Sequence, residues 1–364
     1  MTGALVHEWI AQSGGSENVL EAMSGIYPDA EIFCLWNDSH GRFDGARVNE
    51  TWLAKTPLRR SKAAALPLMP ATWRSLPAHG YEWALISSHL FAHHASFQDP
   101  MLDRYVYVHT PARYIWNPEL DVRGASLPAR AVAAGFKGLD RRRAREGAQF
   151  AANSEFVRRR ITDAWGVDSR VIHPPVEVTA IQSQDWKESL DEAERAVFDA
   201  LPDGFVLGAS RFIPYKRLDR VIRAGEIAGM PVVLAGNGPE LARLREAADR
   251  ASVDVRFVLS PSNALLRALF ERAIVYVFPA IEDFGIMPVE AMAAGAPVVA
   301  QAVGGAAESV VDGVTGALTT FEDPEDIARA ISVAMTVDRD AVRTHARAFS
   351  HERFASEIRE WVGR

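Results

Sequence analysis

The feature of this sequence that most constrains its fold is the alternation of short apolar runs with amphipathic stretches, separated by glycine and proline. In the first half of the chain, the apolar runs predict strands at 4–8, 31–35, 83–87, 104–109, 147–153 and 169–172. In the second half, they predict strands at 205–209, 231–235, 254–259, 273–278 and 297–300. Amphipathic stretches such as 154–165 and 218–228 predict helices between the strands. This order is typical of parallel α/β units.

A break in the pattern at His173-Pro174-Pro175 marks the expected domain boundary. Paired prolines donate no backbone hydrogen bonds and restrict the residue before them. The chain of 364 residues is long enough for two domains. We expect an α/β protein in which two Rossmann-like doubly wound domains, at 1–172 and 173–342, face each other across a cleft. A helical tail at 343–364 could pack back on the N-terminal domain, and the polar stretch 182–201 predicts a surface helix.

The charge of the chain is distributed unevenly. Residues 1–170 contain 20 Lys and Arg against 18 Asp and Glu, a net charge of +2, and the remaining residues contain 20 against 29, a net charge of −9, which together give −7. General binding of nucleic acid is not expected, because it depends on a basic surface. The single cysteine, Cys34, cannot form an internal disulfide. Without a signal-peptide pattern or an apolar run of about 18 residues, we expect a cytoplasmic protein.

One predicted strand–loop–helix segment carries two glutamates. Glu282 lies in the loop after the strand, and Glu290 lies in the first turn of a helix whose start suits Pro288. Free backbone N–H groups around Gly285 make an anion site, and a carboxylate on each side could accept hydrogen bonds from sugar or ribose hydroxyls. An ordinary junction with two solvated glutamates explains the spacing equally well.

A second segment places two cations after a strand. Arg211 and Lys216 follow the predicted strand 205–209. A planar guanidinium and a point charge together suit a diphosphate. An exposed basic turn is the simpler explanation, but it accounts less well for Arg211 directly after a strand end, where open α/β sheets bind ligands.

Together these segments resemble the retaining glycosyltransferases of family 4, which have the GT-B fold. The resemblance rests on six features in the expected order: Gly14-Gly15-Ser16-Glu17, Val108-His109-Thr110-Pro111, Ala152-Asn153-Ser154-Glu155-Phe156, Arg211 with Lys216, Ala235-Gly236-Asn237-Gly238-Pro239, and Glu282 with Glu290. The stretches 85–94 and 107–117 resemble bacterial enzymes that build surface polysaccharides, many of which transfer mannose from GDP-mannose.

The resemblance implies a role for each matching residue. Arg211 and Lys216 would hold the diphosphate and stabilise the leaving group, and His109 would contact the sugar near the reacting carbon, although a core histidine is the alternative. Glu282 would hold sugar hydroxyls and Glu290 the ribose. The residues expected to bind the donor are Gly14, Gly15, Arg211, Lys216, Gly236, Leu259, Phe284, Gly285, Ile286 and Glu290; those expected to be catalytic are His109, Glu282, Arg211 and Lys216.

Arg113 and Tyr114 belong to the run 113–117, which could line the acceptor site or form an aromatic core patch. We interpret His89, His93 and His94 as loop and acceptor-side residues. No cysteine or suitably spaced carboxylate near these histidines completes a metal site in the sequence. No Asp-x-Asp element is placed to bind a metal-bridged diphosphate. We therefore expect no metal ion and no cofactor, and the implied reaction transfers the sugar with retention of configuration.

The expected function is the transfer of a hexose from a nucleotide sugar to a glycan or lipid-linked acceptor in bacterial polysaccharide or glycolipid assembly. The resemblance favours mannose from GDP-mannose as the donor, and a UDP-linked sugar is the alternative. A nucleotide-sugar epimerase, a non-catalytic sugar-nucleotide-binding protein and a phosphorylase are the alternatives. Basic residues Lys55, Arg59, Arg60 and Lys62 lead into Leu66, Leu68, Met69 and Trp73. This combination suits peripheral contact with an anionic membrane at the inner face of the plasma membrane, although a solvated basic face is the usual explanation.

Overall fold

The structure of the protein is a computed structural model that describes residues 3–39, 41–77, 80–99, 101–116 and 127–363, without the side chains of 46, 114 and 127–134. The chain divides into two compact units. Unit 1 contains Met1–Pro175 and Glu352–Arg364, and unit 2 contains Val176–His351. The boundary therefore falls after Pro175 rather than after residue 172.

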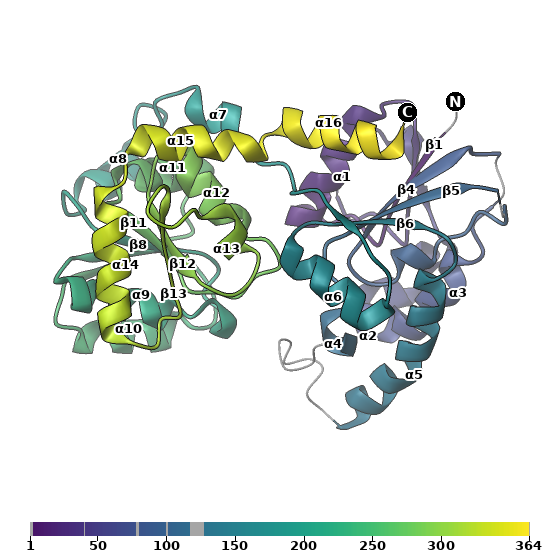
Figure 1. The fold of residues 1–364 in the computed structure, drawn as a ribbon, viewed down its shortest axis with the longest axis horizontal. Coiled ribbons are helices and arrows are strands. Elements are labelled where there is room, and N and C mark those ends of the chain that lie inside the picture. The colour runs from purple at the N-terminus through teal and green to yellow at the C-terminus, as the bar shows by residue number, and fades with distance from the viewer. Residues whose placement is uncertain (1–2, 40, 78–79, 100, 117–126, 364) are drawn as a thin grey trace. The chain divides into compact units, whose positions relative to one another are not determined.

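Unit 1 is built on a parallel sheet with strand order β3-β2-β1-β4-β5-β6-β7 (Figure 1). Its strands are β1 (Gly3–His7), β2 (Glu31–Cys34), β3 (Val48–Glu50), β4 (Trp83–Ser88), β5 (Asp103–Val108), β6 (Gln149–Ala152) and β7 (Arg170–Val171). Its helices are α1 (Gly15–Ile26), α2 (Lys62–Ala65), α3 (Met69–Trp73), α4 (Arg113–Trp116), α5 (Leu127–Ala144), α6 (Glu155–Trp165) and α16 (His351–Val362).

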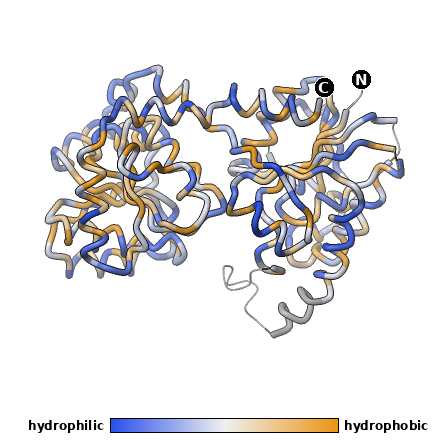
Figure 2. Tube along the Cα trace, in the orientation of Figure 1, coloured by the Kyte–Doolittle hydropathy of each residue, from blue (hydrophilic) through white to orange (hydrophobic). Residues whose placement is uncertain are grey.

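Both faces of the unit 1 sheet are covered, so its central strands are apolar on both sides. On β4, Leu85 packs in one core cluster with Leu20 of α1 and Phe354 of α16. The next residue, Ile86, packs in the opposite cluster with Ile161 of α6. In Figure 2 the apolar segments run through the middle of the unit. The predicted tail 343–364 is divided between the two units. Its first part, up to His351, belongs to unit 2, and the rest, which forms most of α16, packs in unit 1.

Unit 2 is built on a second parallel sheet with strand order β10-β9-β8-β11-β12-β13. Its strands are β8 (Val206–Ala209), β9 (Val232–Gly236), β10 (Val255–Leu259), β11 (Val275–Phe278), β12 (Val298–Gln301) and β13 (Gly316–Thr319). Its helices are α7 (Val178–Gln182), α8 (Glu192–Asp199), α9 (Leu218–Ala228), α10 (Leu241–Arg250), α11 (Asn263–Arg272), α12 (Ile286–Ala293), α13 (Ala306–Ser309), α14 (Pro324–Thr336) and α15 (Arg339–Ala346). Tyr276 of β11 packs with Met292 of α12, and Val277 packs on the other face with Val221 of α9.

Each sheet is doubly wound, and its strand order reverses at one point. In unit 1 the reversal lies between β1 and β4, and in unit 2 it lies between β8 and β11. Open α/β sheets bind ligands beyond the carboxyl ends of the strands at such points. Two edge strands, β3 and β13, are additions to the predicted set. No described helix combines the length and apolar character that a bilayer span requires.

The prediction of one surface helix over 182–201 is wrong. Trp186 is buried in the core of unit 2, and its indole N–H donates to the carbonyl of Ile181 at 2.8 Å. The Asp185 side chain accepts the backbone N–H of Lys187 at 3.0 Å, which forms a turn. Because the chain turns inward to bury Trp186, the helix α8 begins only after the Asp191 cap.

Candidate functional site

The carboxyl edge of the unit 2 sheet gathers polar residues from distant parts of the chain. Arg211 follows β8, Gly236 ends β9, Leu259 ends β10 and Glu282 follows β11. These four strands are neighbours in one parallel sheet, so their carboxyl ends lie along the same edge. The sequence predicted these positions for a bound ligand, and the fold brings them to one place.

Lys216 and Glu282 form an ion pair at this edge. Lys216 Nζ donates to Glu282 Oε1 at 2.6 Å, and the two side chains are only 12% and 16% exposed. Lys216 also lies 5.4 Å from the centre of the Phe278 ring. The sequence assigned these residues to different parts of a ligand, whereas in the protein alone they neutralise each other. Arg211 is exposed, and no described side chain pairs with its guanidinium.

The charges of Glu290 and Glu282 both affect the pKa of the buried Tyr276. Burial, and then the charges of Glu290 and Glu282, hold the pKa of Tyr276 well above its ordinary value. Its hydroxyl donates to the carbonyl of Ala209 at 2.9 Å. Burial also raises the pKa of Glu290 itself, with Arg267 opposing the rise. Glu290 is the fifth residue of α12, so it lies one turn later in the helix than the sequence predicted.

The start of α12 is shaped by glycine. Gly285 precedes the helix at φ 92, a conformation that favours glycine, and no side chain caps the helix. The first N–H groups of a helix have no partner within it, so they can bind an anion. The Phe284 side chain is buried, with its ring 5.7 Å from that of Phe349, and therefore packs in the core.

A second glycine pair supports this segment, and the sequence analysis missed it. Gly305 follows β12, and its N–H donates to the carbonyl of Glu282 at 2.8 Å. A Cβ at Gly305 would lie 2.1 Å from the carbonyl oxygen of Asp283, so only glycine allows the two loops to meet. The signal was present in the sequence as a strand followed by Gly304-Gly305, the same pattern as at Gly14-Gly15.

The loops after β9 and β10 are joined by side-chain hydrogen bonds. Asn237 Nδ2 donates to Ser260 Oγ at 3.0 Å, and Asn237 Oδ1 accepts the N–H of Gly238 at 2.8 Å. Leu259, predicted to border a ligand, is 40% exposed beside them. This end of the edge therefore offers an apolar side chain next to a fixed polar loop.

The carboxyl edge of the unit 1 sheet holds a chain of imidazoles. His7 ends β1, and its Nδ1 lies 3.0 Å from Ser87 Oγ of β4. The same hydroxyl lies 2.8 Å from Nε2 of His109, the residue after β5. Burial holds the pKa of His109 well below its ordinary value, so its ring is neutral at pH 7. The sequence predicted His109 but missed His7, which no local pattern distinguishes from a strand residue.

Glu8 and His89 lie beside this chain. Glu8 is fully buried, and its Oε1 accepts the backbone N–H groups of Leu90 and Ala92, each at 2.8 Å. Its Oε2 lies 3.3 Å from Nδ1 of His89. Burial acts to raise the pKa of Glu8, but the nearby His89 and His7 and the backbone N–H groups of Ala92 and His89 lower it overall. Glu8 therefore stays charged inside the protein.

The N-terminal glycines and the predicted acceptor residues are placed as follows. Gly14 precedes α1 in a turn around Glu17, whose Oε1 accepts the N–H of Ala11 at 3.2 Å. Gly15 is exposed at the start of the helix. Arg113 begins α4 and is half-buried. The side chain of Tyr114 lies outside the described residues.

The prediction that His93 and His94 are acceptor-side residues is wrong, because both are fully buried in unit 1. Asp140 accepts a hydrogen bond from Nε2 of His94 at 3.0 Å, and its second oxygen accepts the indole N–H groups of Trp116 and Trp165, each at 2.7 Å. Nε2 of His93 lies 3.1 Å from the same carboxylate. The statement that no carboxylate stands near these histidines is also wrong, since folding supplies Asp140 here and Glu8 beside His89.

The comparisons with known proteins agree with this architecture. Residues 191–350 match the family model described as Glycosyl transferases group 1. The chain is 33% identical over 187 residues to a D-inositol 3-phosphate glycosyltransferase of Mycobacterium avium, covering 49% of this chain and 43% of the relative. A protein of the same name from Geodermatophilus obscurus is 33% identical over 243 residues, covering 58% and 52%. The chain thus spans about half the length of the curated relatives it matches.

Solved structures resemble the chain over nearly its whole length. The Anabaena protein Alr3699/HepE in complex with UDP and glucose has a TM-score of 0.71 and 20% identity, covering 99% of each chain. Sucrose-phosphate synthase from Thermosynechococcus elongatus has a TM-score of 0.71 and 18% identity, covering 99% of this chain and 98% of the other. The predicted α/β fold with two doubly wound domains, as in GT-B proteins, is confirmed.

Proposed function

We propose that this protein transfers a hexose from a nucleotide-diphosphate sugar to a glycan or lipid-linked acceptor, with retention of configuration. The family match and the GT-B fold support a glycosyltransferase. The observation that carries the proposal is the meeting of Arg211, Lys216 and Glu282 at the carboxyl edge of the unit 2 sheet, with Glu290 on the next helix.

The diphosphate is assigned to the two cations. Arg211 is exposed and ready to bind phosphate oxygens, and it would stabilise the charge that grows on the leaving group. Lys216 must exchange its bond to Glu282 for one to phosphate. The same exchange releases the carboxylate of Glu282, which can then accept hydrogen bonds from hydroxyls of the transferred sugar. Binding of the diphosphate and of the sugar are therefore linked through one ion pair.

Glu290 and His109 complete the proposed set. Glu290 would accept hydrogen bonds from the ribose hydroxyls. His109 is held neutral, so it would offer a neutral hydrogen-bonding group near the reacting carbon rather than a positive charge. A neutral imidazole suits a transition state with positive charge on the sugar ring, because a charged imidazolium would destabilise that state.

Two donor classes remain open to experiment. The resemblance to surface-polysaccharide enzymes favours GDP-mannose. The solved relative that holds UDP and glucose favours a UDP-linked hexose instead. The curated relatives are named for a D-inositol 3-phosphate acceptor, so a phosphorylated polyol joins the glycan and lipid-linked acceptors to be tested.

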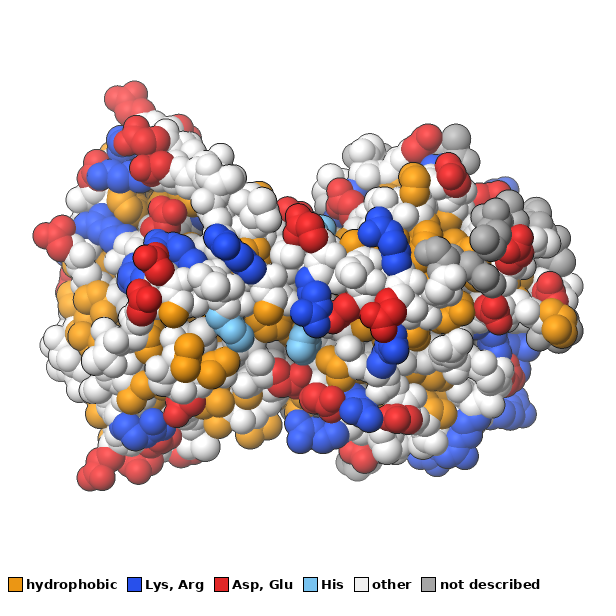
Figure 3. All heavy atoms as spheres, turned by 45° about the horizontal axis from the view of Figure 1, so that its top comes forward, with side chains coloured by type: hydrophobic (Ala, Val, Ile, Leu, Met, Phe, Trp, Pro, Cys, Tyr) orange, Lys and Arg blue, Asp and Glu red, His pale blue; other side chains and the backbone are white. Residues whose placement is uncertain are grey.

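We also propose peripheral contact of unit 1 with an anionic membrane at the cytoplasmic face. Trp52 and Leu68 are 49% and 38% exposed, and Lys55 and Arg60 are exposed nearby in sequence. The surface is smaller than the sequence suggested. Met69 and Trp73 are fully buried, Arg59 is paired with Asp38, and Lys62 lies 3.9 Å above the Trp9 ring. Figure 3 shows basic and acidic side chains mixed over most of the face it displays.

A panel of nucleotide sugars tests the proposal, first by thermal shift and then by product analysis. We expect one donor to stabilise the protein and to yield a glycosylated acceptor. Arg211→Ala should abolish both effects, whereas Arg245→Ala, an exposed arginine on α10, should not. Epimerised donor without any transfer would identify an epimerase. Binding without turnover on any acceptor would identify a sugar-nucleotide-binding protein, and absorbance of a pyridoxal group would identify a phosphorylase.

A further inference from the structure

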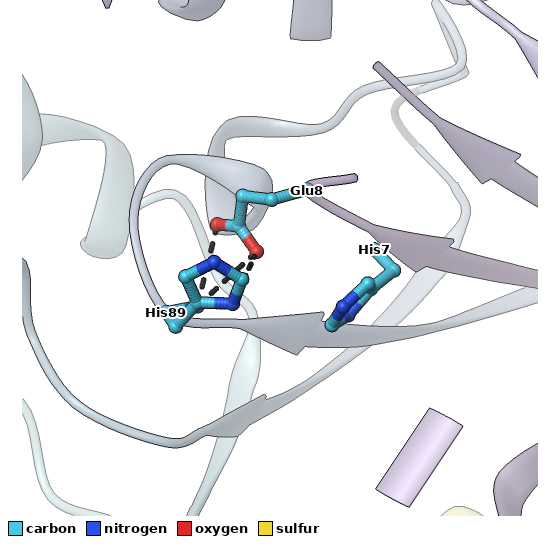
Figure 4. Close-up of side chains that lie close together, drawn as sticks. All are labelled: His7, Glu8 and His89. Atoms are coloured by element: carbon cyan, nitrogen blue, oxygen red, sulfur yellow. Dashed lines mark hydrogen bonds and ion pairs between the residues drawn. The ribbon is translucent and has the colours of Figure 1, made fainter. Parts of the chain in front are cut away.

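Unit 1 contains a group of side chains arranged like a metal centre, formed by His7, Glu8 and His89 (Figure 4). His7 and Glu8 lie at the carboxyl end of β1, and His89 is the first residue after β4. One ligand atom from each residue lies within 4.8 Å of the other two. Figure 4 shows Glu8 and His89 facing each other, with His7 beside them.

The His7 ring has one nitrogen in use and one without a partner. Its Nδ1 is fixed by Ser87 Oγ at 3.0 Å. Its Nε2 has no hydrogen-bond partner among the described residues, although the side chain is fully buried. Buried polar atoms normally have partners, and one that lacks a partner points to a ligand that it could bind. The fixed Nδ1 holds the ring so that Nε2 is the coordinating atom.

Glu8 and His89 are spaced as two ligands of one ion. Two backbone N–H groups, of Leu90 and Ala92, hold Glu8 Oε1, and the N–H of His89 lies 3.2 Å from Oε2. Oε2 lies 3.3 Å from His89 Nδ1. That separation matches the edge of a tetrahedron whose bonds are about 2.0–2.1 Å long, the usual length for zinc with nitrogen or carboxylate oxygen.

We propose that Nε2 of His7, Oε2 of Glu8 and Nδ1 of His89 bind a divalent transition-metal ion of the zinc class. Two imidazoles and one carboxylate are a common donor set for zinc. Ser87 and the backbone N–H groups supply the outer hydrogen bonds that orient such ligands. His89 is 20% exposed, which gives the ion a route from solvent.

The sequence predicted no metal ion on two grounds. The first concerned a metal-bridged diphosphate, whose charge the proposed function assigns to Arg211 and Lys216 of unit 2. The second was the lack of a suitably spaced carboxylate near His89, and the proposal departs from it because folding brings Glu8 beside His89. The proposed site belongs to unit 1, and its ligands come from residues 7–8 and 89, too far apart in the sequence for any local motif to reveal them. Its presence or absence leaves the assignment of the donor residues unchanged.

The proposal does not extend to the other group of two histidines and a carboxylate in unit 1. Asp140 already accepts hydrogen bonds from two indoles and from His94, and His93 lies against the same carboxylate. All three side chains are fully buried. A metal ion there would have to displace the hydrogen bonds that Asp140 already accepts, and none of the three side chains reaches solvent.

The test uses the full chain, freed of metal by a chelator and then titrated with Zn²⁺. We expect about one equivalent to bind to the wild type at micromolar or lower concentration, and His89→Gln to weaken binding at least about tenfold. His351→Gln, which changes a partly exposed histidine of unit 2, should bind as the wild type does. Circular dichroism of each variant confirms its fold.

Substitution by Co²⁺ provides a second readout that does not depend on a variant. A four-coordinate site with two imidazoles should give intense visible absorption, which His89→Gln should remove. The proposal is overturned if the wild type takes up no stoichiometric Zn²⁺, or if His89→Gln binds it as tightly as the wild type. It is also overturned if Co²⁺ gives only the weak spectrum of a six-coordinate aqueous ion.

Discussion

The two units differ in how deeply they bury the polar residues at and near their sheet edges. Unit 1 buries them, so that His94 and Asp140 lie inside the core and His7 and Glu8 lie beneath the sheet edge with no exposed surface. At the carboxyl edge of the unit 2 sheet, by contrast, Arg211 is exposed, and the paired Lys216 and Glu282 are only partly buried. Buried polar groups are normally fixed by partners, whereas charges nearer the surface can exchange one partner for another. Substitutions should therefore destabilise unit 1 and alter ligand binding in unit 2.

The largest effect is expected from Asp140→Ala in unit 1. It removes the acceptor shared by two indole N–H groups and two imidazoles, of which only the Trp116 indole is partly exposed. Breaking a buried polar cluster of this kind costs about 3–5 kcal/mol in the free energy of unfolding. Urea denaturation followed by tryptophan fluorescence measures it. Asp168→Ala removes a carboxylate that is 79% exposed and should change stability by no more than about 0.5 kcal/mol. Equal losses of stability in Asp140→Ala and Asp168→Ala would show that the buried cluster of unit 1 does not depend on Asp140.

The second effect is a pH dependence of opposite sign in the two units. Burial, and then His93, lower the pKa of His94 to about 4, so this side chain binds fewer protons in folded unit 1 than in the unfolded chain between about pH 6.5 and 4. His94 alone should lower the stability of unit 1 by up to about 1.4 kcal/mol per pH unit between pH 6.5 and 4. The lowered pKa values of His7 and His109 act in the same direction.

In unit 2, burial, and then the charge of Asp185, raise the pKa of Glu271 to about 7. Folded unit 2 therefore binds more protons than the unfolded chain between about pH 7 and 4.5, and this carboxyl stabilises unit 2 as the pH falls. Thermal unfolding at pH 7.5, 6 and 5 checks both signs. Parallel loss of stability in both units would contradict the expectation.

The third effect concerns the ion pair of unit 2. Glu282→Ala should reduce turnover at least about tenfold, equivalent to about 1.4 kcal/mol of transition-state stabilisation. Because the change also releases Lys216, the affinity for the free nucleoside diphosphate should stay the same or rise. Steady-state kinetics and calorimetry measure the two quantities separately. Glu246→Ala, an exposed glutamate on α10, is the matched control and should leave turnover unchanged. Wild-type turnover in Glu282→Ala would show that Glu282 does not bind the transferred sugar.

The fourth effect is a loss of donor affinity in Glu290→Gln. The amide is a poorer acceptor for ribose hydroxyls, so binding should weaken by about tenfold without unfolding. Because the pKa of Glu290 is raised by burial, donor affinity in the wild type should decline as the pH falls, and the glutamine variant should not show that decline. An identical pH profile in both proteins would show that Glu290 does not face the donor.

The smallest effect is expected on the surface of unit 1. Arg60→Gln should weaken binding to vesicles that contain anionic phospholipid by about fivefold, with the loss disappearing at high salt. Arg353→Gln removes an exposed cation from α16 and should leave binding unchanged. Vesicle sedimentation measures both. Absence of binding by the wild type would remove the membrane proposal and leave the other assignments intact.

The positions that sequence analysis predicted correctly are those that follow from a strand end. Arg211 and Glu282 each come directly after an apolar run, and parallel strands bring such positions together. His7 and Asp140 could not be found in this way, because their partners lie 80 and 46 residues away in the chain. The helix predicted at 182–201 failed because local polarity does not reveal that Trp186 is buried.

The position of α16 affects how the protein is made. Phe354 and Trp361 of this helix pack against Tyr107 and Tyr105 of β5, with ring centres 5.8 and 5.4 Å apart. A ribosome therefore finishes every residue of unit 2 before it releases the helix that completes the core of unit 1. Until then one hydrophobic face of the N-terminal sheet stays partly uncovered, and the half of the protein that is synthesised first is the last that can finish folding.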